Sequence, residues 1–221
     1  MGILEAIVVV YLRQIYYPNG FKFPLAIISN QIIKVELLRE TCTLIMLVSI
    51  AWIASKNKLQ IFSYFLLSFA LWDIVYYIGL KLLLDWPSSF FTWDILFLIP
   101  IPWVGPVISP IIISVTMIIL ASVLLYIKNH NSNLKLKFFE WFLIYLGAVL
   151  IFASFIWDYS AMIFFKGFDR NAISIETNNS LNEMLSSYVP NYFHWEIFSL
   201  GLIAIYLSIY LIIKRNLIKR K

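Results

Sequence analysis

The stretch DWPSSFFTWDILFLIPIPWVGPVISP, from Asp85 to Pro110, decides how this chain folds. It holds five of the eight prolines and three of the eight tryptophans of the chain. Proline fixes φ and removes a backbone donor, so the stretch cannot form one regular helix. It is nevertheless apolar enough to sit in a membrane, where such backbone survives only if buried in protein or lining a wet cavity. The stretch therefore predicts a re-entrant segment that shapes a site.

The composition around this stretch is that of a membrane protein. Hydrophobic residues make up 62% of the chain, charged residues 13%, and the mean hydropathy is +0.85, whereas roughly a quarter of the residues in soluble domains are charged. We expect one integral membrane domain over residues 1–221. The net charge of +5 does not indicate nucleic-acid binding, because the basic residues fall at the ends of predicted spans. A single cysteine, Cys42, excludes an internal disulfide framework.

Long apolar runs predict an all-α polytopic membrane protein with five transmembrane helices. The predicted spans are residues 28–54, 59–84, 107–127, 138–165 and 194–213. Residues 1–17 are predicted to contain a short N-terminal helix. Its apolar part, residues 3–17, would be about 22 Å long, which is less than the hydrocarbon core of about 30 Å. That helix is either interfacial, the slightly preferred interpretation, or a sixth span. The connecting parts are a re-entrant or capping segment at 85–106, a loop at 166–193 and a basic tail at 214–221.

The basic loops predict the orientation of the spans. Cytoplasmic loops carry an excess of Lys and Arg, and three separate basic segments (residues 56–58, 128–137 and 214–221) fall on one side of the predicted bundle and hold ten of the seventeen Lys and Arg residues. We therefore expect the protein to be integral to a cytoplasmic or inner membrane, with a cytoplasmic C-terminus. The proline-rich segment and the loop 166–193 then face the extracytoplasmic side.

Acidic residues of several spans are predicted to share one layer. Measured as helix rise from the cytoplasmic ends, the acids of four spans lie in the outer third of the membrane. Glu36 and Glu40 lie on one helix face with Thr43, and Asp73 lies on one face with Tyr77. Charges at such depth are costly and usually mark sites. The ligand or ion-binding candidates are Glu36, Arg39, Glu40, Asp73, Tyr77, Asp94, Asp158, His194 and Glu196.

Each candidate also has a structural interpretation. The cluster of Glu36, Arg39 and Glu40 is equally well explained as an ion pair within one helix, and a lone histidine such as His194 is more often interfacial than a ligand. The residues predicted to shape the site are Pro100, Pro102, Trp103, Gly105 and Pro106. An oxygen-rich cluster would suit a divalent cation, but no carboxylate spacing is specific for one. No cofactor is predicted, and no catalytic residue is assigned.

Three functions fit these features. The first is a non-catalytic subunit of a membrane assembly, whose polar layer packs against partner subunits or further copies of the chain. The second is a cation-binding protein or a cation- or proton-coupled transporter, which would use the acids together with the broken segment. The third is an intramembrane enzyme that acts on a lipid-linked or extracytoplasmic substrate. The sequence favours the subunit by a small margin, with the lipid bilayer as the one certain partner.

Overall fold

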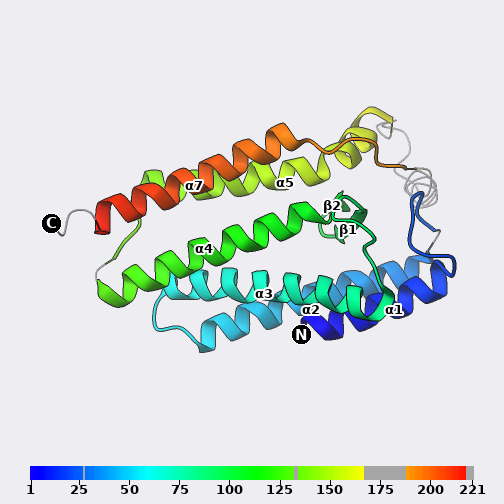
Figure 1. The fold of residues 1–221 in the computed structure, drawn as a ribbon, viewed down its shortest axis with the longest axis horizontal. Helices are drawn as coiled ribbons and strands as arrows, with labels where there is room; N and C mark the ends of the chain where they lie inside the picture. The colour runs from blue at the N-terminus through cyan, green and yellow to red at the C-terminus, as the bar shows by residue number, and fades with distance from the viewer. Residues whose placement is uncertain (27, 132–133, 167–187, 218–221) are drawn as a thin grey trace.

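A bundle of six helices with a small β-hairpin at one end makes up the described part of the chain (Figure 1). The computed structural model describes residues 1–26, 28–131, 134–166 and 188–217. The elements are α1 (Gly2–Tyr16), α2 (Asn30–Ile53), α3 (Lys58–Leu84), β1 (Trp93–Phe97), β2 (Trp103–Pro106), α4 (Ile108–His130), α5 (Phe138–Lys166) and α7 (Trp195–Leu217).

Four of the described helices are long and apolar enough to cross a membrane. They are α3, α4, residues Phe138–Ala161 of α5 and residues Trp195–Asn216 of α7. The prediction of a mostly helical integral membrane protein is thereby confirmed. The remaining predicted span, residues 28–54, corresponds to α2, which has 24 residues but carries several charges. Its buried residues are Glu36, Glu40, Thr43, Leu47 and Ala51, which is a single stripe at helical spacing.

Local signals set the ends of α2 and α3. The side chain of Ser29 accepts a hydrogen bond from the Ile32 amide at the start of α2, and the side chain of Asn57 accepts one from Gln60 at the start of α3. Both residues are preferred helix N-caps, because their oxygens satisfy amides that have no intrahelical partner. Asp85 ends α3 in the left-handed conformation with φ of 51°, and Pro87 follows, which cannot continue a helix.

The helix α1 runs alongside α3. A Cβ placed on Gly2 would lie 2.6 Å from the Trp72 carbonyl oxygen, and one placed on Gly79 would lie 2.7 Å from Ala6. Higher residue numbers in α1 thus face higher numbers in α3, so the two helices run in the same direction. The small residues at these positions allow the close approach.

The proline-rich segment contains an antiparallel β-hairpin, which is a correction to the all-α prediction. Trp93 pairs with Pro106, Asp94 with Gly105 and Ile95 with Val104, and the register shifts before Phe97 pairs with Trp103. Pairing between strands satisfies backbone groups that apolar surroundings would leave unsatisfied. Pro100 and Pro102 lie in the connection between the strands, where no ladder donor is needed.

The bundle divides into two groups of helices. The pair α5 and α7 lies on one side, α1, α2 and α3 lie on the other, and α4 lies between them with the hairpin at its start (Figure 1). The hairpin also contacts α5, since the Trp103 ring lies 4.9 Å from that of Phe152 and a Cβ on Gly105 would lie 2.7 Å from the Phe155 ring. The hairpin and α4 therefore join the two groups.

Replacing Gly147 by leucine should separate α5 from α7. A Cβ on Gly147 would lie 2.6 Å from the Gly201 carbonyl oxygen, so a larger side chain must displace backbone. We expect the variant to lose about 1–3 kcal/mol or more of stability, measured by dodecyl sulfate titration in lipid–detergent micelles. Ala148→Leu, at the exposed neighbouring position, is the matched control and should leave stability nearly unchanged. Equal losses in the two variants would contradict this packing.

Candidate functional site

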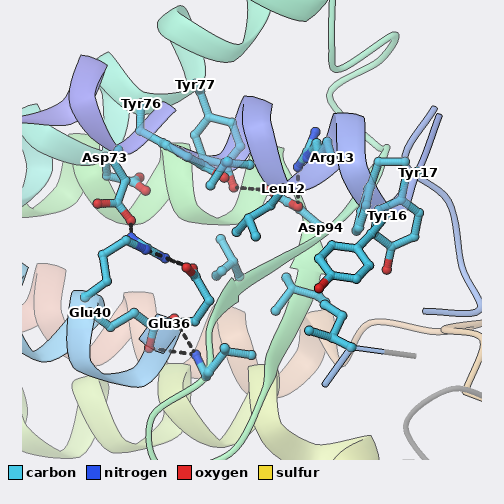
Figure 2. Close-up of a pocket in the computed structure, with 18 of the residues that line it drawn as sticks. Leu12, Arg13, Tyr16, Tyr17, Glu36, Glu40, Asp73, Tyr76, Tyr77 and Asp94 are labelled. Atoms are coloured by element: carbon cyan, nitrogen blue, oxygen red, sulfur yellow. Dashed lines mark hydrogen bonds and ion pairs between the residues drawn. The ribbon is translucent and has the colours of Figure 1, made fainter. Parts of the chain in front are cut away.

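A charged cavity lies between α1, α2, α3 and β1 (Figure 2). Its volume is about 150 Å³. Five carboxylates and two guanidiniums line it: Glu5, Glu36, Glu40, Asp73 and Asp94, with Arg13 and Arg39. Aromatic residues complete much of the wall, namely Tyr16, Tyr17, Phe21, Trp72, Tyr76 and Tyr77. Residues far apart in the sequence thus meet around one partly open space that is lined by charged and aromatic side chains.

Arg39 joins α2 to α1. Its Nη2 lies 2.7 Å from Oε2 of Glu36, to which Nε also donates a hydrogen bond of 2.8 Å. The same guanidinium forms an ion pair with Glu5 of α1, and Thr43 donates a hydrogen bond of 3.4 Å to Glu5. The ion pair between Glu36 and Arg39, which the sequence predicts within α2, is therefore part of a network that also includes Glu5 of α1.

Arg13 and Asp94 form a buried ion pair at the hairpin. Nη2 of Arg13 lies 2.9 Å from Oδ1 of Asp94, and the Tyr77 hydroxyl donates a hydrogen bond of 3.2 Å to Oδ2. Asp94 is only 1% exposed. Burial raises the pKa of the Asp94 carboxyl above its ordinary value, and the adjacent guanidinium opposes that rise. The carboxylate form of Asp94 therefore depends on Arg13.

Glu40 and Asp73 have no ion-pair partner among the described residues. Both carboxylate oxygens of Glu40 accept from the Leu98 amide, at 3.0 Å each, directly after strand β1. Asp73 accepts a hydrogen bond of 2.7 Å from the Ser114 hydroxyl of α4. These two neutral donors stabilise the carboxylates but bring no positive charge. Glu40 and Asp73 are consequently the acids of this cavity that form no ion pair of their own, although the charge of Arg39 still attracts Glu40.

The remaining candidates, Asp158, His194 and Glu196, form a second cluster between α5 and α7. His194 lies between the two acids, with Nε2 3.4 Å from Asp158 and Nδ1 3.1 Å from Glu196. The Tyr188 hydroxyl donates to Asp158 and that of Tyr192 donates to Glu196, at 2.9 Å and 3.0 Å. As far as the described residues show, none of the three candidates lines the charged cavity. The predicted layer therefore consists of two separate clusters.

The predicted site-shaping residues lie behind the cavity rather than in its wall. None of Pro100, Pro102, Trp103, Gly105 and Pro106 lines it in the described structure. Strand β1 and the residue after it provide the wall instead, through Asp94, Ile95, Leu96 and Leu98. Trp103 and Gly105 pack against α5, which holds the hairpin in place behind that wall.

Glu5, Arg13 and Ser114 were not predicted. The pattern that could have indicated Arg13 is the buried face of α1, because Gly2, Ala6 and Arg13 are spaced for one side of a helix. An arginine on the same face as two small residues indicates packing inward rather than solvation. Ser114 offers no such signal, since a serine in an apolar helix commonly bonds its own backbone.

Metal binding finds no support in the side-chain geometry. Within the described residues, no group of three or more His, Cys, Asp and Glu side chains is arranged to hold a metal ion. The chemistry offered is instead an excess of negative charge with aromatic walls and hydroxyl donors.

The fold and the cavity define an integral membrane protein with a charge-lined interior space. No protein-family model, curated protein or solved structure matches the chain.

Proposed function

We propose that this protein binds a small organic cation in the cavity between α1, α2, α3 and β1, as a membrane-embedded binding protein or transporter. The observation that carries the proposal is the count of charges around the cavity, five carboxylates against two guanidiniums. Buried charge of one sign is costly unless it is neutralised. A bound cation, or protons in its absence, supplies the missing positive charge next to Glu40 and Asp73.

The lining favours an organic cation over a metal ion. Aromatic faces attract ammonium and guanidinium groups, and the cavity is lined by rings of Trp72, Tyr76 and Tyr77. Carboxylates and aromatic rings together match a substituted ammonium, which has both a charge and an apolar stem. A metal ion would require several oxygens at short distances from one point, and no such group is found among the described residues.

The proposal includes an arrangement in the membrane. In it, α2 is the fifth span, the basic segments are cytoplasmic, and the hairpin caps the cavity on the extracytoplasmic side. The buried polar stripe of α2 supports this, because charged residues in spans face the protein interior. The ligand would then enter from outside. The alternatives of a non-catalytic subunit and of an intramembrane enzyme stay predictions, since no specific contact favours either.

Cysteine labelling tests this orientation. In a Cys42→Ser background, Lys56→Cys in the loop between α2 and α3 should react with a membrane-impermeant maleimide only in inverted vesicles. Phe91→Cys, at an exposed position before β1, should react only in intact cells or right-side-out vesicles. The reverse pattern, or labelling of both positions from one side, would refute the proposed arrangement.

Cation binding is measured on the purified protein in lipid nanodiscs. Methylammonium, ethylammonium, guanidinium, sodium and potassium are titrated at constant ionic strength, with heat of binding as the readout. We expect saturable binding of an organic cation, weakened about tenfold or more in Glu40→Gln and in Asp73→Asn, because each variant removes one buried charge–charge attraction. Glu196→Gln changes an acid outside the cavity and should bind as the wild type does. Absence of saturable binding, or equal affinities in all variants, would refute the proposal.

A further inference from the structure

Three buried donors among the cavity-lining residues have no hydrogen-bond partner. Nη1 of Arg39 is one of them, and it forms an ion pair with Glu5. The other two are Nη1 of Arg13 and Nε1 of Trp72, and both atoms are inaccessible to solvent. The two residues are 7% and 8% exposed, and both line the charged cavity. Nearly all buried N–H groups in proteins are paired, and each exception calls for an explanation. A ligand with acceptor oxygens would satisfy both donors once the side chains that now cover these two atoms move aside.

The surroundings of Arg13 leave only the edge of its guanidinium free for a ligand. The central carbon of the guanidinium lies 3.7 Å from the ring centre of Trp86 and 4.4 Å from that of Phe21, so aromatic rings cover the planar faces. One nitrogen, Nη2, is bonded to Asp94. The planar, forked edge of a guanidinium matches the two oxygens of a carboxylate or phosphate. Because Nη2 is bonded to Asp94, Nη1 is the terminal nitrogen of Arg13 that remains for an acceptor oxygen of a ligand.

Arg13 also lies between the cavity and a second pocket. That pocket has a volume of about 350 Å³ and is lined by Arg13, Gln14, Tyr17, Pro18, Gly20, Phe21, Leu84 and Trp86. Arg13, Tyr17 and Phe21 line both spaces. Arg13, which is paired with Asp94, therefore lies at the boundary of the cavity toward this pocket. Glu40 and Asp73, which form no ion pair of their own, belong to α2 and α3.

We propose that the ligand is zwitterionic, with a primary ammonium group and an anionic oxygen group in one small molecule. Its ammonium group neutralises the acids around Glu40 and Asp73, and its anionic oxygens accept hydrogen bonds from Arg13 and Trp72. This inference rests on the proposed function and narrows its ligand class. Free amino acids and the phosphoethanolamine headgroup of a lipid share this chemistry, so the experiment contains a probe for each source.

The test compares ligands that differ only in the anionic group. Binding to the nanodisc-embedded protein is measured for n-alkylammonium ions, for ω-amino carboxylic acids of one to five methylene groups, and for O-phosphoethanolamine. We expect at least one zwitterion to bind about tenfold to a hundredfold more tightly than the alkylammonium ion of the same length, because it adds charge-assisted hydrogen bonds. Tighter binding of an amino acid assigns a free solute, and tighter binding of O-phosphoethanolamine assigns a lipid headgroup.

Two conservative variants test whether the unpaired donors cause the tighter binding of the zwitterion. Arg13→Lys keeps the charge but loses the fork, and Trp72→Phe keeps an aromatic ring but loses the N–H. Each should reduce the advantage of the zwitterion, measured as the ratio of its affinity to that of the alkylammonium ion of the same length in the same variant. Lys81→Gln, on the exposed side of α3, is the control and should change neither affinity.

The outcomes separate this inference from the proposed function. Alkylammonium ions that bind as tightly as every zwitterion would overturn the inference and leave cation binding intact. An advantage that survives in both Arg13→Lys and Trp72→Phe would overturn the assignment of these donors, and water would then be their partner. No binding by any compound that carries an ammonium group would overturn both the inference and the proposed function.

Discussion

Replacing Arg13 by methionine is expected to lower the free energy of unfolding by about 3–5 kcal/mol, the usual cost of removing one partner from a buried ion pair. The methionine keeps an apolar stem between Phe21 and Trp86, so the main loss is the positive charge beside Asp94. That carboxylate would be left nearly inaccessible to solvent with only the Tyr77 hydroxyl as a side-chain donor. Titration with dodecyl sulfate in lipid–detergent micelles, followed by tryptophan fluorescence, measures the change.

A double variant distinguishes lost charge pairing from lost packing. Adding Asp94→Asn to Arg13→Met removes the orphaned charge and keeps the side-chain shape, so most of the lost stability should return. Lys81→Met is the comparison for an exposed pair, because Lys81 bonds Asp85 at 2.7 Å on the surface, and it should be close to wild type. A double variant as unstable as Arg13→Met would show that the ion pair is not the cause.

Replacing Arg39 by methionine should have an effect at least as large, since two carboxylates lose their partner. Glu36 of α2 and Glu5 of α1 both pair with this guanidinium. Without it, three acids of one network, including Glu40, face one another in a largely buried space, which costs about 3–5 kcal/mol or more. Lowering the pH protonates unpaired carboxylates and removes the repulsion. The gap in stability between variant and wild type should therefore be wide at pH 7.5 and narrow at pH 5.

Arg39→Lys is the matched control for this variant. A lysine keeps the positive charge but cannot donate from a planar fork to two acids at once. The stability of Arg39→Lys should therefore lie between that of the wild type and that of Arg39→Met. Its dependence on pH should resemble that of the wild type. A gap between Arg39→Met and wild type that stays constant from pH 7.5 to pH 5 would mean that the carboxylates do not repel one another in the variant.

Helical periodicity explains which parts of the site could be predicted. Glu36, Glu40 and Thr43 were placed on one face by their spacing alone, and the structure buries all three. Asp73 and Tyr77 were likewise assigned to one face, and both line the cavity. The spacing of residues along a helix fixes their relative direction, because the backbone geometry is regular. Such predictions depend on local structure only and are therefore reliable.

Lateral position could not be predicted in the same way. The rise along a helix indicates the depth of a residue in the membrane, but it does not indicate which neighbour the helix has. Asp158, His194 and Glu196 were therefore assigned to the same layer as Asp73, whereas the structure places them between α5 and α7. The depth of a residue in the membrane and the helices next to it are separate properties. The second depends on packing between helices that are distant in the sequence.

Strand pairing was missed for a related reason. The segment from Trp93 to Pro106 has prolines and an apolar run without clear alternation, so its sequence indicates only that it is not a helix. The hairpin forms because Asp94 meets Gly105 and Ile95 meets Val104, and those pairings depend on the space between α4, α5 and α2. The same space fixes Leu98 against Glu40, which no local pattern reveals.

The division of the bundle into two groups has a consequence for how the molecule responds to change. Among the described residues, every side chain around the charged cavity comes from the first 98 positions, while α5 and α7 hold each other through the close approach at Gly147 and Gly201. Distant sites without shared partners contribute to stability independently. The pair α5 and α7 can therefore be redesigned, tagged or crosslinked without replacing a side chain of the charged cavity, provided that the contacts of Phe152 and Phe155 with the hairpin are kept.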